Sequence, residues 1–204
     1  MQLSTMRTNV RSRCGLSASD GLASDAILTE FINSSIRTFS MEQDWPWLKA
    51  TESFNTVVDT TIYTPTTGFR TSQSVTSEGT DLPYRTMRDM ADPLRFEGSP
   101  LFFSVDFNKL VIAPKPDAVY AIVHTYTATE TALAADGDEP LIYDWAIDKP
   151  IIMAAKLLAT RLKDPSLMQL LNAELREVDK AIANEVRQAR PAPIPKHRTD
   201  WYIH

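Results

Sequence analysis

The sequence predicts an α+β fold: a helical domain with N-terminal helices and a C-terminal helical hairpin, an inserted small antiparallel β domain, and an extended C-terminal tail. Apolar residues recur at helical spacing near both ends, whereas the middle is rich in short β-branched and aromatic runs. Three prolines then crowd into residues 191–195. We expect the helical domain to comprise residues 1–49 and 140–190, the β domain residues 50–139, and an extended arm residues 191–204.

The N-terminal part predicts two helices. Residues 5–13 form a short helix that ends near Gly15, because glycine suits the left-handed position after a helix. Ser24 is a favourable N-cap for the second helix. This helix is expected to run to about Asp44, because Trp45 precedes a proline and is therefore disfavoured in the helical region. The residues that follow helical spacing along it are Ile27, Leu28, Phe31, Ile32, Ser35, Ile36 and Phe39.

The middle of the chain predicts short β-strands. β-Branched and aromatic residues gather in runs that turn residues separate. These runs are residues 54–58, 61–63, 101–105, 110–113 and 119–126. Between residues 71 and 96 we expect one further strand pair and a helical turn near residues 87–90. Short strands at this spacing are typical of a small antiparallel sheet or sandwich.

Two further helices are expected after the β domain. The first begins at Lys149, capped by Asp148 and with Pro150 in its first turn, or it starts earlier, capped by Asp144 and with a kink at Pro150. It is broken before Pro165, and a long amphipathic helix then packs against it as a hairpin. The apolar residues of the long helix are Leu167, Leu171, Leu175, Val178, Ile182, Val186 and Ala189.

Composition and motifs argue against several classes of protein. No run approaches the ~20 apolar residues of a membrane span, and the N-terminus lacks the apolar core of a signal peptide. The single cysteine, Cys14, fits a reducing compartment. His124, His197 and His204 lack metal-ligand spacing, and the acidic loop at residues 136–139 lacks the distal glutamate of a calcium loop. We therefore expect no metal, no cofactor and no enzymatic activity.

The charge is unevenly distributed along the chain. The net charge of −5 argues against a free nucleic-acid-binding protein. Residues 51–150 carry seven basic and fifteen acidic side chains, whereas residues 151–204 carry nine basic and six acidic ones. This asymmetry suggests different neighbours for the two regions, although unequal solvated faces would give the same pattern.

Three tryptophans lie at the edges of the expected helices. Trp45 and Trp47 flank a proline at a helix exit, and Trp145 precedes the third helix. The pair can plug the seam between the helical and β domains, anchor a neighbouring subunit, or form a ligand platform. We expect one of the two to lock the seam and the other to lie near a neighbouring subunit, and we assign Trp145 to a subunit or domain interface.

The C-terminal tail predicts a docking arm. Prolines stiffen its start, and its end is aromatic. Tryptophan, tyrosine and arginine are enriched at interface hot spots, whereas disorder-prone tails are poor in aromatic residues. The predicted partner-binding residues are Pro191, Pro193, Ile194, Pro195, Arg198, Trp201, Tyr202 and Ile203.

Several of these segments resemble the head–tail connector (adaptor) proteins of tailed bacteriophages. The likeness includes Asp44-Trp45-Pro46-Trp47-Leu48 at the helix exit, Gly98-Ser99-Pro100, and the strand–proline–strand segment at residues 110–120. It extends over nearly the whole chain, with one departure at Thr64, where the family pattern has an apolar residue before Pro65.

The resemblance implies a virion protein at the head–tail junction, made in the host bacterial cytoplasm. It implies a ring, commonly of about twelve copies, that binds beneath the portal protein. The ring extends the DNA channel and offers a platform to tail or neck proteins. Double-stranded DNA would pass through the lumen without sequence-specific binding, which an acidic subunit favours. No membrane partner is implied, and the portal is the expected partner of the arm.

Three alternatives stay open at this stage. One is another neck or tail ring protein, such as the tail tubular type of short-tailed phages. A carbohydrate-binding module would need its aromatic platform on an exposed β face, whereas these tryptophans flank helices. An enzyme that uses carboxylates outside any known motif is the third.

Overall fold

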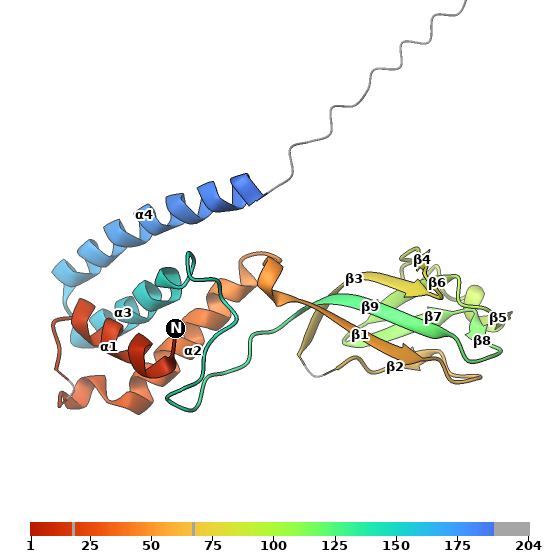
Figure 1. The fold of residues 1–204 in the computed structure, drawn as a ribbon, viewed down its shortest axis with the longest axis horizontal. Helices are drawn as coiled ribbons and strands as arrows, with labels where there is room; N and C mark the ends of the chain where they lie inside the picture. The colour runs from red at the N-terminus through yellow and green to blue at the C-terminus, as the bar shows by residue number, and fades with distance from the viewer. Residues whose placement is uncertain (18, 67, 190–204) are drawn as a thin grey trace, which may run out of the picture.

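The computed structural model describes residues 1–17, 19–66 and 68–189, and it confirms the α+β fold class. The helices lie at one end of the molecule and the strands at the other (Figure 1). The chain enters the strand region at β1 (Lys49–Asn55) and leaves it at the end of β9 (Ala121–Ala128). These two strands pair with each other, so both crossings between the helical and strand regions lie close together.

The two N-terminal helices are α1 (Leu3–Arg13) and α2 (Asp25–Met41), each at its predicted place. Gly15 follows α1 with a φ of +66°, the left-handed conformation expected there. Ser24 has the extended backbone of an N-cap, but its side chain makes no capping hydrogen bond. Between them lies the short 3₁₀ helix η1 (Gly21–Ala23).

The predicted end of α2 at Asp44 is wrong, because the helix stops at Met41. The last carbonyl groups of a helix have no partner within it, and here distant side chains bind them. The indole Nε1 of Trp45 donates to the Phe39 carbonyl at 2.9 Å, and Arg70 donates to the Ser40 carbonyl at 2.5 Å. The chain then turns through the 3₁₀ helix η2 (Pro46–Leu48) into β1.

The C-terminal helices α3 (Asp148–Leu162) and α4 (Pro165–Ala189) form the predicted hairpin. Of the two predicted starts of α3, the later one is confirmed, with Pro150 in the first turn. Asp148 is the first helical residue and not the cap, a position that Ile147 occupies. Between the helices, Asp164 Oδ1 accepts from the Leu167 amide at 2.9 Å, so this carboxylate caps α4 ahead of its N-terminal proline.

The strands form two antiparallel sheets and one short parallel pair. The larger sheet has the order β1-β9-β3-β4, with β3 (Phe69–Ser77) and β4 (Thr80–Leu82) as the predicted extra hairpin. The smaller antiparallel sheet has the order β2-β7-β6, formed by β2 (Ile62–Tyr63), β7 (Lys109–Ala113) and β6 (Phe102–Asp106).

Two details of the strand region differ from the prediction. The first strand begins at residue 49 and ends at residue 55, so only residues 54 and 55 of the predicted run 54–58 belong to it. In addition, β5 (Glu97–Gly98) pairs in parallel with β8 (Lys115–Pro116), although only antiparallel pairing was expected. The predicted helical turn is confirmed, since the Met90 amide donates to the Thr86 carbonyl at 3.1 Å, and the 3₁₀ helix η3 (Pro93–Arg95) follows it.

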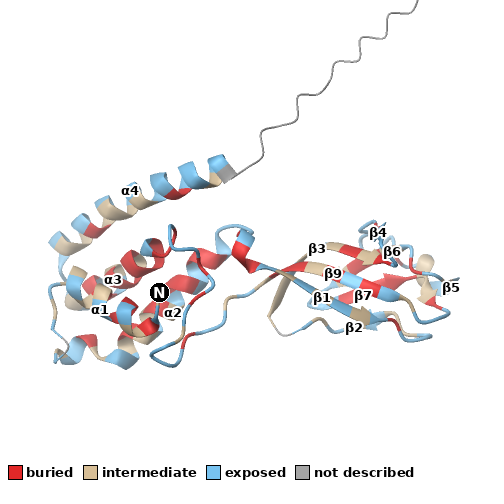
Figure 2. Cartoon of the chain, in the orientation of Figure 1, coloured by how far each residue is buried: buried red, intermediate tan, exposed pale blue. Residues whose placement is uncertain are grey.

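The described residues contain a large hydrophobic core among the helices and smaller ones among the strands, which Figure 2 shows as separate groups of buried residues. The helical core includes Leu133, which comes after the last strand. The main strand core lies between the two antiparallel sheets and contains Val75, Leu82, Phe103, Leu110, Ile112 and Ile122. The exact domain division at residues 49/50 and 139/140 stays a prediction.

Candidate functional site

The connection between helices and strands is built around five aromatic rings, which we call the aromatic junction: Phe39, Trp45, Trp47, Tyr143 and Trp145. Trp45 and Trp47 stack with their ring centroids 4.6 Å apart and their planes at 13°. Phe39 lies 4.6 Å from Trp45. Trp47 also contacts Tyr143 at 5.2 Å and, edge-on, Trp145 at 5.7 Å. The junction thus joins α2, its exit and the segment before α3.

Exposure separates the rings of this junction into two groups. Trp45 and Trp47 are only 2% and 8% exposed, so both pack in the core of a single chain. Their burial favours, for both, the predicted role of packing between the helical and β domains. It also excludes an exposed ligand-binding platform formed by these two rings. Tyr143 and Trp145 are 47% and 38% exposed, and Leu141 beside them is 59% exposed. The predicted subunit contact at Trp145 is compatible with this exposure and stays a prediction.

A clamp that the sequence did not predict fastens the strands to the helix exit. The Arg70 guanidinium on β3 donates to the Gln43 carbonyl at 3.2 Å and to Asp44 Oδ1 at 2.7 Å, in addition to the Ser40 carbonyl. A planar guanidinium presents five N–H donors in a rigid fork, so it can bind several acceptors in fixed directions at once. An arginine inside a polar strand was the only local signal for this contact.

A buried lysine ties α4 to the same helix exit. Lys149 Nζ lies 2.7 Å from both Glu42 Oε2 and Asp179 Oδ1, and the residue is 9% exposed. Burial disfavours its charged form, but the two carboxylates outweigh this effect and hold the pKa of Lys149 above its ordinary value. A groove of about 400 Å³ lies beside this bridge and includes Val186 near the end of α4.

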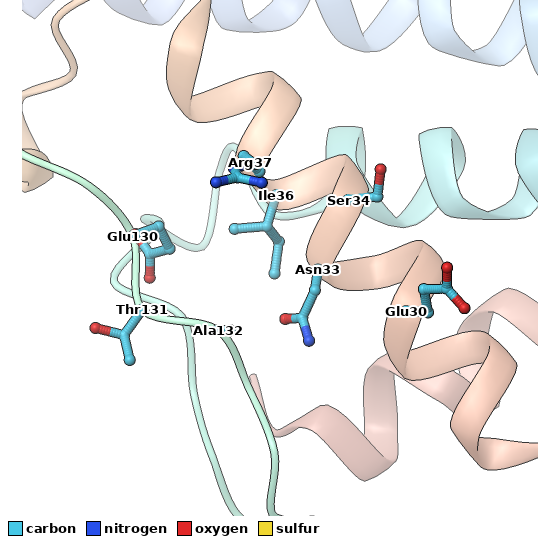
Figure 3. A pocket seen from close by; sticks show the side chains of 8 residues that line it. All are labelled: Glu30, Asn33, Ser34, Ile36, Arg37, Glu130, Thr131 and Ala132. Carbon is cyan, nitrogen blue, oxygen red and sulfur yellow. The ribbon is translucent and has the colours of Figure 1, made fainter. Parts of the chain in front are cut away.

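A second pocket, of about 400 Å³, lies where the chain returns from the strands and passes α2. Figure 3 shows Asn33 and Arg37 on the helix, and Glu130 on the returning segment. The Asn33 side chain exchanges two hydrogen bonds of 2.9 Å with the backbone of Leu133. Burial raises the pKa of Glu130, whose Oε1 accepts from the Leu141 amide at 2.7 Å. These contacts fasten the returning segment to α2.

The strand region contains a buried chain of polar groups. His124 Nδ1 lies 2.9 Å from Glu52 Oε1, and its Nε2 lies 3.1 Å from Ser72 Oγ. The order serine–histidine–carboxylate is that of a hydrolytic triad, but His124 is fully buried under Phe69 and Tyr126, so no substrate reaches the ring. Ile122, His124 and Tyr126 alternate along β9 on one face, and all three are buried.

Acid is expected to weaken the fold through Glu52. Burial opposes its charged form, yet hydrogen bonds from Thr66 and His124 hold the pKa of Glu52 below its ordinary value of 4.5. A carboxyl group with a lowered folded-state pKa stabilises the fold above its unfolded pKa, and this stability is lost as the pH falls through the folded pKa. Thermal unfolding between pH 7 and pH 3 should therefore show a smaller acid-induced drop in Tm for Glu52→Gln than for the wild type. Parallel curves would contradict this assignment.

We expected no metal site because the acidic loop at residues 136–139 lacks a distal glutamate and the histidines lack metal-ligand spacing. The loop carboxylates are engaged otherwise: Asp138 Oδ2 accepts from the amides of Ala134 and Ala135 at 2.8 Å, and Asp136 pairs with Arg7. The residues that the structure describes include no cluster of three or more potential metal ligands. Burial raises the pKa of the Cys14 thiol to about 11, which keeps it protonated. No described helix is long and apolar enough to span a membrane.

The structure brings together only some of the predicted site residues. The three tryptophans predicted as interface residues meet in the aromatic junction. All the predicted portal-contacting residues, from Pro191 to Ile203, lie outside the described residues. Their role therefore stays a prediction.

The polar clusters hold elements of the fold together, and exposed apolar side chains border the aromatic junction. Comparison with protein families gives the class of protein: the family described as SU10 adaptor protein matches residues 1–195. The chain belongs to this family of bacteriophage adaptor proteins, which is a structural family and not an enzyme family. No curated protein matches the chain significantly.

Proposed function

We propose that the protein forms the head–tail connector ring of a tailed phage, docks beneath the portal and offers the tail its attachment platform. Membership of the adaptor family over residues 1–195 carries this proposal. The exposed edge of the aromatic junction supports it, because each copy in a ring must contact its neighbours through two different surfaces. Copies that each carry a net charge of −5 let DNA slide through the lumen without strong phosphate binding.

We assign portal binding to the arm, residues 191–204. Deleting it is expected to abolish co-sedimentation with isolated portal rings, since the deletion removes the aromatic and basic residues best suited to an interface. The circular dichroism spectrum and the Tm should stay close to those of the full chain, because the deletion leaves every residue of the described cores in place. A truncated protein that still sediments with the portal would contradict this assignment.

A matched variant separates portal binding from ring formation. Trp145→Ala changes the exposed edge of the aromatic junction and leaves the arm intact. It is expected to retain the first contact with the portal but to reduce the contact between neighbouring copies. If isolated tail proteins and not the portal retain the wild-type protein, the tail tubular alternative holds.

A further inference from the structure

The turn between β6 and β7 presents an apolar side chain that the single chain does not use. Phe107 is 96% exposed and has a φ of +54°, a backbone conformation that disfavours residues with a side chain. Glycine is the ordinary choice at such a turn position. The Phe107 ring is not stabilised by burial within its own chain. Its exposure together with this backbone conformation therefore indicates a contact with another chain.

The helical region contains a cavity that suits such a ring. A groove of about 300 Å³ lies between α2, α3 and α4, and its apolar lining comes from Met153, Leu157 and Met168. Methionine side chains adapt readily to an inserted group.

We propose that the Phe107 turn of one copy inserts into this groove of the next copy. The ring would contact the methionines and Leu157. Asp106 at the base of the turn would meet Lys156 at the rim of the groove. Lys156 has no ion pair within the residues that the structure describes. Apolar and charged groups are thus matched at two neighbouring points.

This contact is of the kind that a ring needs. Phe107 belongs to the strand region and the groove to the helical region, so the two surfaces differ and the contact is heterologous. Heterologous contacts repeat from copy to copy, and they close into rings when the rotation allows it. The inference rests on the proposed connector function and names the surfaces that would make the ring.

Disulfide cross-linking tests the contact directly. Phe107→Cys and Leu157→Cys are combined in a Cys14→Ser background, assembled on portal rings and oxidised. Non-reducing gels should show a ladder of covalent oligomers, and each single-cysteine variant should give at most dimers. Phe107→Cys with Leu141→Cys is the matched control, because Leu141 is exposed but lies outside the groove. Rings visible by electron microscopy without a ladder overturn the inference alone, whereas absence of any ring overturns the proposed function as well.

A second variant separates this role from a structural one. Phe107→Gly suits the turn conformation, so its Tm should equal or exceed that of the wild type. Its assembly into rings should nevertheless weaken on the order of tenfold or more, as for a hot-spot residue. Asp106→Lys should weaken assembly as well, and Lys156→Glu should restore it. Wild-type assembly by Phe107→Gly would overturn the proposal.

Discussion

Replacing Trp45 with alanine is expected to lower the free energy of unfolding by about 3–5 kcal/mol. The indole is buried, stacks between Phe39 and Trp47, and binds the Phe39 carbonyl at the end of α2. The substitution therefore creates a cavity and also removes one of the two hydrogen bonds that the Phe39 carbonyl accepts, the other coming from the Glu42 amide at 3.2 Å. Urea unfolding followed by circular dichroism measures the change.

Trp145→Ala is the matched control for this effect. Trp145 belongs to the same aromatic junction but is 38% exposed, so its removal should cost on the order of 1 kcal/mol. Trp45→Phe should fall between the two, because it retains a buried ring and loses the hydrogen bond. Equal destabilisation by Trp45→Ala and Trp145→Ala would contradict the assignment of Trp45 to the seam.

His124→Ala is expected to destabilise the strand region by about 2–4 kcal/mol. The buried ring bridges Glu52 on β1 and Ser72 on β3, so its loss removes a hydrogen-bond partner from each of these partly buried groups. His124→Gln keeps one polar group at this position and should recover part of the loss. Thermal unfolding followed by near-ultraviolet circular dichroism, which reports on nearby Tyr126, measures both variants. An unchanged Tm for His124→Ala would show that the polar chain contributes nothing to stability.

The sequence predicted those elements whose stability depends on local pattern. The stripe of α2 is an example, since Leu28, Ile32, Ser35, Ile36 and Phe39 are all buried as their spacing requires. The end of the same helix was mispredicted, because Arg70 and the Trp45 indole bind its last carbonyls after the chain has folded. The start of β1 was missed for a related reason: this strand is an edge strand with polar residues, and its pairing with β9 defines it.

The site was predicted less completely than the fold. Aromatic residues at element edges drew attention to Trp45, Trp47 and Trp145, whose rings meet in the aromatic junction. Spacing along the chain could not show that two of them are buried. The Lys149 bridge was equally inaccessible, because Glu42 lies 107 residues away from its partner and the pair shares no local motif.

Electron microscopy of the purified protein mixed with isolated portal tests the connector function most directly. We predict a ring of this protein at the narrow end of the portal, coaxial with its channel. Portal particles that remain bare at that end, with this protein in excess and its fold intact, would contradict the proposed function.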